Sequence, residues 1–283
     1  MKKVLFVLLL CAAALAQRNP EAPPPPAPGT TGAPQAAAGP IPVQDENVRK
    51  ARQLLDQCVQ ALGGQAWLTY RTKQGHGRSY SFYHGRPNSL GVQFWSFWKW
   101  PDMQRTEITK QRDVIYIYNG DKGYEKTYKG TRALEKKDVD EYLRARHYSL
   151  EEIFRVWLKQ PGVALFYDGP TIAENKQAER VTIMNAQNES VSLDLDTLTH
   201  LPIRRTFDYR EPDTGWKDTD VEAYDGYRLE DGINTPHTVT RYKNGDMIGE
   251  RFYATVQYNT DLPDSMFQAT VTYDPFKSPT IPK

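Results

Sequence analysis

The sequence contains no long apolar run. A single short one stands at its start. Residues 4–14 form that run, two lysines precede it, and Ala14-Leu15-Ala16 follows. This arrangement predicts a Sec-type signal peptide over residues 1–16 and an exported mature chain without a transmembrane span. Lipidation at Cys11 is a weaker alternative, because Leu10 stands where a lipobox usually has a small residue.

Cysteine is almost absent as well. The chain has two cysteines, Cys11 and Cys58, and cleavage after Ala16 would remove the first. A mature chain with one cysteine forms no intrachain disulfide, so the fold must be stabilised by its core. Cys58 lies on the apolar face of a predicted helix, which favours a buried and unreactive thiol.

The chain also has no excess of charge of either sign. It contains 36 Lys+Arg and 35 Asp+Glu, for a formal net charge of +1. Loss of Lys2 and Lys3 with the signal peptide would change the net charge to −1. This balance gives no electrostatic reason to expect nucleic acid or an anionic membrane surface as a partner.

No catalytic constellation stands out. The five histidines stand singly, without a second ligand at metal-binding spacing, and nucleophile elbows and phosphate loops are missing. Asp194 and Asp196 share one strand face, as paired acids do in glycosidases. They lead into a polar turn, which favours a solvated strand end. We therefore predict no catalytic residue, no metal site and no cofactor.

The composition divides the chain into segments. Residues 17–44 hold nine of the twenty prolines and predict a flexible linker. Residues 45–267 are long enough for one large domain. The predicted tail, residues 268–283, is again rich in proline, and we expect it to be loose.

Two stretches of the domain have helical periodicity. Residues 47–62 place apolar side chains at spacings of three and four, and Gly63-Gly64 provides a stop. Residues 138–159 keep the same spacing, with a capping box at Ser149–Glu152. The second stretch therefore predicts two helices with a break near Tyr148-Ser149.

The rest of the domain has strand signals. Alternating runs are separated by turn residues such as Asn119-Gly120 and Asn244-Gly245. We count about ten to twelve sequential strands by this pattern. The prediction is a mainly β, α+β fold: one large curved antiparallel sheet or half-barrel with helices covering its concave face.

Aromatic residues are abundant, with 17 Tyr, 10 Phe and 6 Trp. They are densest in residues 92–100. As a strand, this segment would point Phe94, Trp98 and Trp100 to one side and Trp95 and Phe97 to the other. Such a strand either lies between two apolar layers or lines an apolar cavity. The aromatic residues could also simply fill the core of a disulfide-free β-domain.

Short motifs follow one another between residues 47 and 267. They are Leu62-Gly63-Gly64, the P-x-x-x-R-x-E pattern of residues 101–107, the NG-x-x-G-aromatic pattern of residues 118–124, Leu201-Pro202-Ile203-Arg204, Asp225-Gly226-Tyr227 with Thr235-Pro236-His237, and residues 256–267. In this order the motifs resemble the LolA-like family of outer-membrane lipoprotein-sorting proteins. The resemblance implies a half-barrel that holds lipid chains between its sheet and its helices.

The resemblance implies a function for the aromatic surplus. A non-catalytic carrier, located in the periplasm or at the outer membrane, would bind lipid or lipoprotein acyl chains, with envelope proteins as further partners. Two alternatives stay open: a ligand-free interaction or sensor module on the same fold, and an exported enzyme with a dispersed site. The predicted cavity residues are Phe94, Trp98, Trp100 and Tyr116 on the sheet, and Leu143, Leu150, Phe154 and Trp157 on the covering helices.

Overall fold

The computed structural model describes residues 43–88 and 90–275. The predicted signal peptide with Cys11, the predicted linker up to residue 42 and the last eight residues of the predicted tail lie outside the described residues.

Strands dominate the described chain. They are β1 (Thr72–Tyr83), β2 (Arg86–Pro87), β3 (Val92–Lys99), β4 (Met103–Ile108), β5 (Val114–Asn119), β6 (Lys122–Thr127), β7 (Gly130–Ala133), β8 (Ala164–Ala173), β9 (Lys176–Met184), β10 (Ser190–Asp196), β11 (Pro202–Arg210), β12 (Lys217–Glu230), β13 (Ile233–Lys243) and β14 (Asp246–Tyr258).

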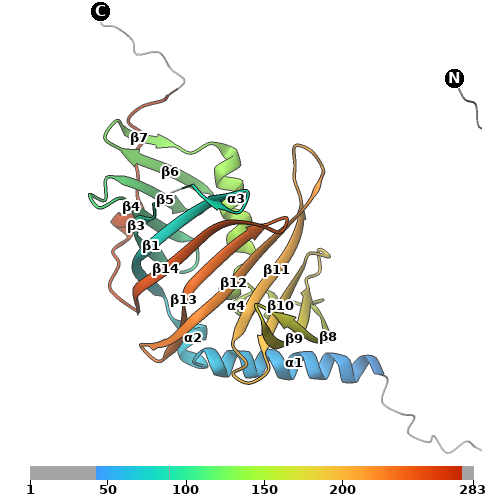
Figure 1. The fold of residues 1–283 in the computed structure, drawn as a ribbon. Helices are drawn as coiled ribbons and strands as arrows, with labels where there is room; N and C mark the ends of the chain where they lie inside the picture. Colours follow the sequence, from blue (N-terminus) through green and yellow to red (C-terminus); the bar gives the residue numbers. More distant parts are fainter. Residues whose placement is uncertain (1–42, 89, 276–283) are drawn as a thin grey trace, which may run out of the picture. The chain divides into compact units, whose positions relative to one another are not determined.

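All of these strands belong to one 14-stranded antiparallel sheet (Figure 1). Its order is β7-β6-β5-β4-β3-β1-β14-β13-β12-β11-β10-β9-β8, with the short β2 paired to β1. Two meanders are thus joined where β1 lies beside β14, and β7 and β8 remain as the two edges. The predicted large antiparallel sheet is confirmed; it is open, and it has 14 strands where about ten to twelve were expected.

Turn chemistry explains several of the hairpins. Asn244 and Gly245 both have positive φ, 53° and 86°, and join β13 directly to β14. Asp231 and Gly232 join β12 to β13 in the same way, with φ of 49° and 81°. Two successive residues with positive φ give the tight turn whose twist matches that of paired strands.

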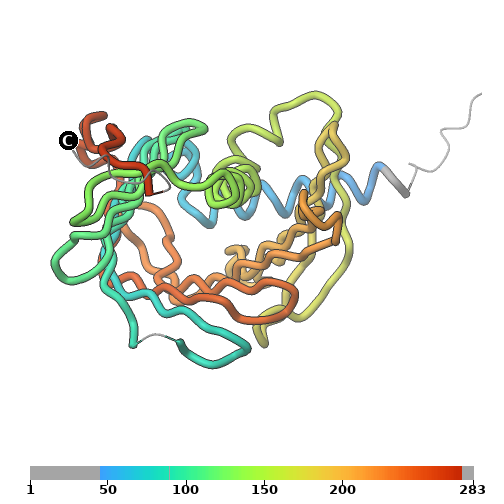
Figure 2. The backbone as a smooth tube through the Cα atoms, turned by 90° about the horizontal axis from the view of Figure 1, so that it is seen from above, coloured from blue at the N-terminus to red at the C-terminus, as the bar shows by residue number. Residues whose placement is uncertain are grey.

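Helices cover one side of the curved sheet (Figure 2). They are α1 (Val43–Leu62), α2 (Gln65–Thr69), α3 (Lys136–His147), α4 (Leu150–Arg155) and the short 3-10 helix η1 (Trp157–Lys159). A second 3-10 helix, η2 (Asp264–Phe267), follows the last strand. None of the helices in the described part of the chain has both the length and the hydropathy that a membrane crossing requires.

The predicted break in the second helical stretch is confirmed. α3 ends at His147, and Ser149 caps α4 by accepting a hydrogen bond from the backbone N–H of Glu152 at 3.2 Å. The first predicted helix is also present, but α1 begins at Val43, inside the predicted linker. α2 has five residues and η2 has four, too few for a recognisable helical period in the sequence, and neither was predicted.

Two close contacts hold the end of α1 against the sheet. Gly63 has a φ of 128°, and a Cβ there would lie 2.6 Å from the carbonyl oxygen of Gly232. Beside it, the amide of Asn234 donates to the carbonyl oxygen of Ala61 at 2.7 Å. Only glycine permits this approach of helix end and hairpin turn.

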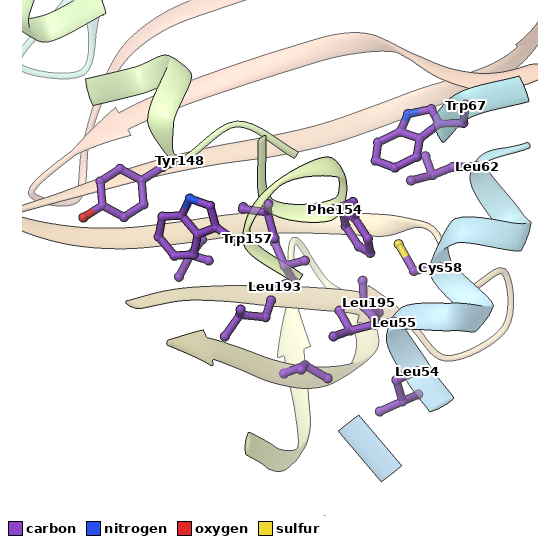
Figure 3. Close-up of a cluster of buried hydrophobic side chains, with 14 of the residues drawn as sticks. Leu54, Leu55, Cys58, Leu62, Trp67, Tyr148, Phe154, Trp157, Leu193 and Leu195 are labelled. Atoms are coloured by element: carbon purple, nitrogen blue, oxygen red, sulfur yellow. The ribbon is translucent and has the colours of Figure 1, made fainter. Parts of the chain in front are cut away.

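The main core lies between the helices and the concave face. Cys58 and Leu55 of α1 meet Phe154 of α4 and side chains such as Leu193 and Leu195 of β10 (Figure 3). Cys58 has no exposed surface, and burial raises the pKa of its thiol well above the usual range. The thiol is therefore a packing group, as predicted.

The strand β3 is apolar on both faces for a reason that the structure shows. Phe94 contacts the ring of Tyr253 edge-on at 5.1 Å on the inner side. On the outer side, Phe97 packs with Leu262 and the fully buried Phe267 of η2. The segment after β14 therefore forms a third layer over the outside of the sheet, and β3 lies between two apolar layers.

The same C-terminal segment continues along the edge strand β7. The backbone N–H of Thr272 donates to the carbonyl oxygen of Thr131 at 2.8 Å, and the N–H of Thr131 donates to the Thr272 hydroxyl at 2.8 Å. This part of the predicted loose tail thus packs against the sheet. It occupies hydrogen-bonding groups that an edge strand would otherwise leave unpaired.

We predict that Phe267→Ala lowers the free energy of unfolding by about 3–5 kcal/mol, since it empties a buried aromatic site. Urea denaturation measures this change. Leu198→Ala, at a side chain that is 89% exposed, serves as the control and should change stability by less than about 0.5 kcal/mol. Equal effects of the two substitutions would contradict the role of the C-terminal layer.

Candidate ligand-binding site

A cavity of about 320 Å³ lies on the concave side of the sheet. Its walls come from β1, β11, β12, β13 and β14, from the end of α1, from α2, and from the first residues of α4. Leu62, Trp67, Leu150, Tyr227 and Tyr253 supply aromatic and aliphatic surface. The remaining wall is strongly polar, which the sequence did not suggest.

Glu222 is the best-connected carboxylate of the cavity. It forms an ion pair with the guanidinium of Arg205 at 3.0 Å and accepts a hydrogen bond from the hydroxyl of Tyr224 at 3.0 Å. Arg241 lies 3.9 Å from its other oxygen. Burial alone would raise the pKa of Glu222, but Arg205 and Arg241 outweigh burial, so its pKa lies below the usual range.

A second carboxylate, Glu151, enters from the first turn of α4. The hydroxyl of Tyr70 donates to it at 2.5 Å. Burial acts to raise its pKa, but Lys73 and the Tyr70 hydrogen bond lower it by more. Glu151 is therefore ionised at neutral pH, although it lies among aromatic side chains.

Lys73 on β1 completes the charged wall. Its ammonium lies 5.9 Å from the ring centre of Tyr253 and 5.8 Å from that of Tyr258. Burial acts to lower the pKa of Lys73, whereas the neighbouring tyrosines and Glu151 raise it, and the net shift is upward. Lys73 therefore keeps its positive charge near neutral pH.

These pKa shifts indicate the chemistry that the cavity favours. A general acid or base works best when its pKa lies near the working pH. Here the pKa of Glu151 and Glu222 falls and that of Lys73 rises. All three groups are thus fixed in their charged forms, which favours recognition of charge over proton transfer.

The eight residues predicted to line a cavity do not gather around one space. Leu150 lines the cavity described above, and Leu143 lines an open groove beside α3. Phe94 lies behind Tyr253, and Tyr116 donates a hydrogen bond to Glu125 at 3.1 Å. The others, Trp98, Trp100, Phe154 and Trp157, pack within or beside the core. Their role in ligand binding stays a prediction.

Trp98 and Trp100 have a partner that the sequence did not reveal. The buried guanidinium of Arg155 lies 4.2 Å from the ring centre of Tyr70, 5.0 Å from that of Trp100 and 5.9 Å from that of Trp98. It also donates to the carbonyl oxygens of Tyr70 at 2.9 Å and Trp67 at 2.6 Å. Arg155 therefore sits in an aromatic cage that joins α4 to the start of β1 and the end of β3.

One polar prediction was wrong. Asp194 is not solvated, because it is only 2% exposed and is held by Arg180 at 2.7 Å and Arg204 at 2.8 Å. Among the histidines, His237 is buried, and its ring lies 2.9 Å from Glu230. Among the described residues, no group of three or more His, Cys, Asp or Glu side chains could hold a metal ion.

The sequence matches no protein-family model. The search of curated proteins found no match either. Similar solved structures include a DUF1329 family protein from Desulfovibrio piger, with 12% identity, a TM-score of 0.53, and coverage of 78% of this chain and 97% of that chain. Another is a protein domain from Vibrio parahaemolyticus assigned to outer-membrane lipoprotein sorting, with 9% identity, a TM-score of 0.52, and coverage of 78% and 97%.

A LolA superfamily protein from Nitrosomonas europaea also matches, with 12% identity, a TM-score of 0.46, and coverage of 77% of this chain and 97% of that chain. At such identities the likeness concerns the fold alone. The chain has the fold of the DUF1329 family protein and of the lipoprotein-sorting domain. The resemblance of its motifs to lipoprotein-sorting proteins is thus confirmed at the level of the fold.

We predict that Arg155→Met lowers the free energy of unfolding by about 2–4 kcal/mol, because two buried carbonyl oxygens lose their charged donor. Urea denaturation followed by tryptophan fluorescence measures the change. Arg228→Met, at an exposed arginine of β12, is the matched control. If both variants unfold at the same urea concentration, the cage does not anchor α4.

A second prediction concerns acid. A carboxylate with a lowered folded-state pKa contributes stability above its unfolded pKa of about 4.3 and loses it as pH falls through the folded pKa. Glu222→Gln removes that contribution, so the variant should lose less unfolding free energy than the wild type between pH 6 and about pH 3. Urea titrations at both pH values test this, and identical acid losses would contradict it.

Proposed function

We propose that this protein is an exported, non-catalytic carrier-type protein of the cell envelope, located in the periplasm. It binds an acyl chain of a lipid or lipoprotein between the concave face of the sheet and the helices α3 and α4. The cavity on the concave side, bordered by the end of α1, by α2 and by the first residues of α4, is the observation that carries the proposal. The assignment of the Vibrio domain, which has the same fold, to lipoprotein sorting supports it.

The space available for a ligand sets a requirement. At about 320 Å³, the cavity is at the small end of the range for ligand pockets, which starts at roughly 300 Å³. Each buried CH₂ group contributes about 0.8 kcal/mol, so a longer chain gains affinity only if more space opens. One covering helix must therefore shift when a long acyl chain enters.

The helix α3 is the part of the cover that can shift. None of its twelve residues is fully buried, whereas α4 buries Ile153, Phe154 and Arg155. α3 contacts the sheet through a stack of Tyr142 on Tyr118 at 3.7 Å and through charged side chains at its surface, such as Arg146, which donates to the carbonyl oxygen of Gly120 at 3.2 Å. A stack of two partly exposed rings separates more readily than a buried core. The predicted cavity residue Leu143 lies on this helix, and Leu150 follows the break between α3 and α4 at Ser149.

One observation favours a second function, a ligand-free interaction or sensor module. Much of the space between helices and sheet is filled by the protein's own rings. Tyr148 stacks on Phe207 with ring centres 4.0 Å apart, and Trp157 is 5.5 Å from Tyr148. A module of this kind would keep the closed arrangement and take up no lipid.

A cavity-filling variant separates the two functions. Gly249 lines the cavity, and a Cβ at this position would meet nothing closer than the carbonyl oxygen of Tyr80 at 3.6 Å. Gly249→Trp should therefore fold and fill the cavity. Ala254→Trp places the same side chain at an exposed position of β14 and is the matched control.

We expect protein purified without detergent to carry lipid that mass spectrometry detects, and to take up a fluorescent fatty acid. Gly249→Trp should reduce uptake by at least about tenfold, since the lost site is worth more than 1.4 kcal/mol. Ala254→Trp should bind as the wild type does. An empty extract together with no uptake would refute the carrier and leave the interaction module.

A further inference from the structure

The charges that line the cavity do not cancel one another. Four cationic side chains face three carboxylates, so the lining has one positive charge in excess. The cations are Lys73, Arg205, Arg241 and Arg251, and the carboxylates are Glu151, Glu222 and Glu250.

The carboxylates are already engaged. Glu222 has Arg205 and Tyr224, and Glu151 has Tyr70, as described above. Glu250 accepts a hydrogen bond from the hydroxyl of Thr240 at 3.3 Å. No lining carboxylate is therefore left without a donor.

Two of the cations have no such partner. Within the described part of the chain, neither Lys73 nor Arg251 has a carboxylate oxygen within ion-pair distance, and Glu151 and Glu222 act on them only from farther away. Lys73 is flanked by the rings of Tyr253 and Tyr258, and the guanidinium of Arg251 lies 5.8 Å from the ring centre of Phe94. A ring face attracts a cation but does not neutralise it.

Arg205 adds a donor to the same wall. Arg205 is 3% exposed, donates a hydrogen bond to the Tyr148 carbonyl oxygen and forms an ion pair with Glu222. Its Nε–H is buried and has no hydrogen-bond partner among the described residues. Arg241 pairs outward as well, 3.8 Å from Glu141, whose side chain is 54% exposed. A pair at that distance in contact with water adds little compensation.

We propose that this cavity binds the singly charged anionic head group of its lipid ligand, between Lys73 and Arg251. The inference rests on the proposed carrier function and specifies the ligand class as a monoanionic amphiphile. A carboxylate or a phosphodiester supplies the missing negative charge and accepts a charge-assisted hydrogen bond from Lys73 or from Arg251. Burying an unpaired charge is costly, so the ligand relieves a cost that the empty cavity carries.

The arrangement of the walls suits an amphiphile. Lys73 on β1 is paired in register with Tyr258 on β14, and Arg251 lies seven residues earlier on that strand, opposite Ser79. The apolar wall of Leu62, Trp67 and Leu150 lies at the Lys73 end of the cavity, where α1, α2 and α4 meet the sheet. A head group held by the two cations thus leaves its chain beside that wall and the covering helices.

Three probes with the same 16-carbon chain test the inference: palmitate, its uncharged methyl ester and the monoacyl phosphatidylglycerol. Equilibrium binding is measured by displacement of a fluorescent fatty acid from the full chain. We expect the wild type to bind an anionic probe at least about tenfold more tightly than the ester, as charge-assisted hydrogen bonds imply. The tighter of the two anions identifies carboxylate or phosphodiester as the source.

Substitutions then assign the effect to residues. Lys73→Gln and Arg251→Gln should each remove most of the preference for the anion over the ester. Lys73→Arg keeps the charge and should keep the preference, and Lys126→Gln, at an exposed lysine of β6, is the surface control. Circular dichroism of each variant confirms that it is folded.

The outcomes separate the two proposals. Equal binding of acid and ester by the wild type would overturn the head-group inference and leave the carrier function intact. A preference for the anion that persists in both Gln variants would also overturn it. Binding of none of the three probes would refute the carrier function itself.

Discussion

The position of α4 depends on one buried cation, Arg155. Its guanidinium bonds two carbonyl oxygens just before β1 and lies against Tyr70 and Trp100. Glu151 stands one helical turn earlier and therefore faces the concave side of the sheet, where Tyr70 reaches it. By fixing α4, the cage positions both the core residues of this helix and the residues by which it lines the cavity. A planar guanidinium can stack and donate at the same time, which a lysine cannot do.

The interior combines two chemistries that proteins usually keep apart. Toward β8–β11 it is a dry core built from α1, α4 and the sheet, and toward β12–β14 it is a charged cavity. The boundary runs through Arg205, which is buried like a core residue and bonded like a cavity residue. Fixed charges of this kind cost desolvation and are retained where they orient a ligand or a partner. The charged side also accounts for the directions of two pKa shifts: the pKa of Glu222 lies below its usual range, and that of Lys73 lies above its usual range.

Sequence reasoning found the fold because local signals and the final architecture agree. Asn-Gly turns, alternating runs and the capping box at Ser149 each specify a local structure that survives in the sheet and in α4. The cavity could not be found in this way. Lys73, Glu222 and Arg251 are ordinary charged residues in alternating strands, and only the curvature of the sheet turns them toward one another. The aromatic surplus was visible, but its main purpose, caging Arg155 and filling two layers, depends on contacts far apart in the sequence.

The pairing of β1 with β14 has a consequence for how the domain is made. These strands are the first long strand and the last strand of the sheet, and each meander lacks its central neighbour until they meet. The outward-facing rings of β3, Trp95 and Phe97, are also uncovered until η2, which follows β14 in the chain, packs on them. A growing chain therefore exposes one of its most aromatic strands until almost the whole domain has been synthesised. To fold without aggregating, the chain must pair β1 with β14 before either strand pairs with an unpaired strand of another molecule.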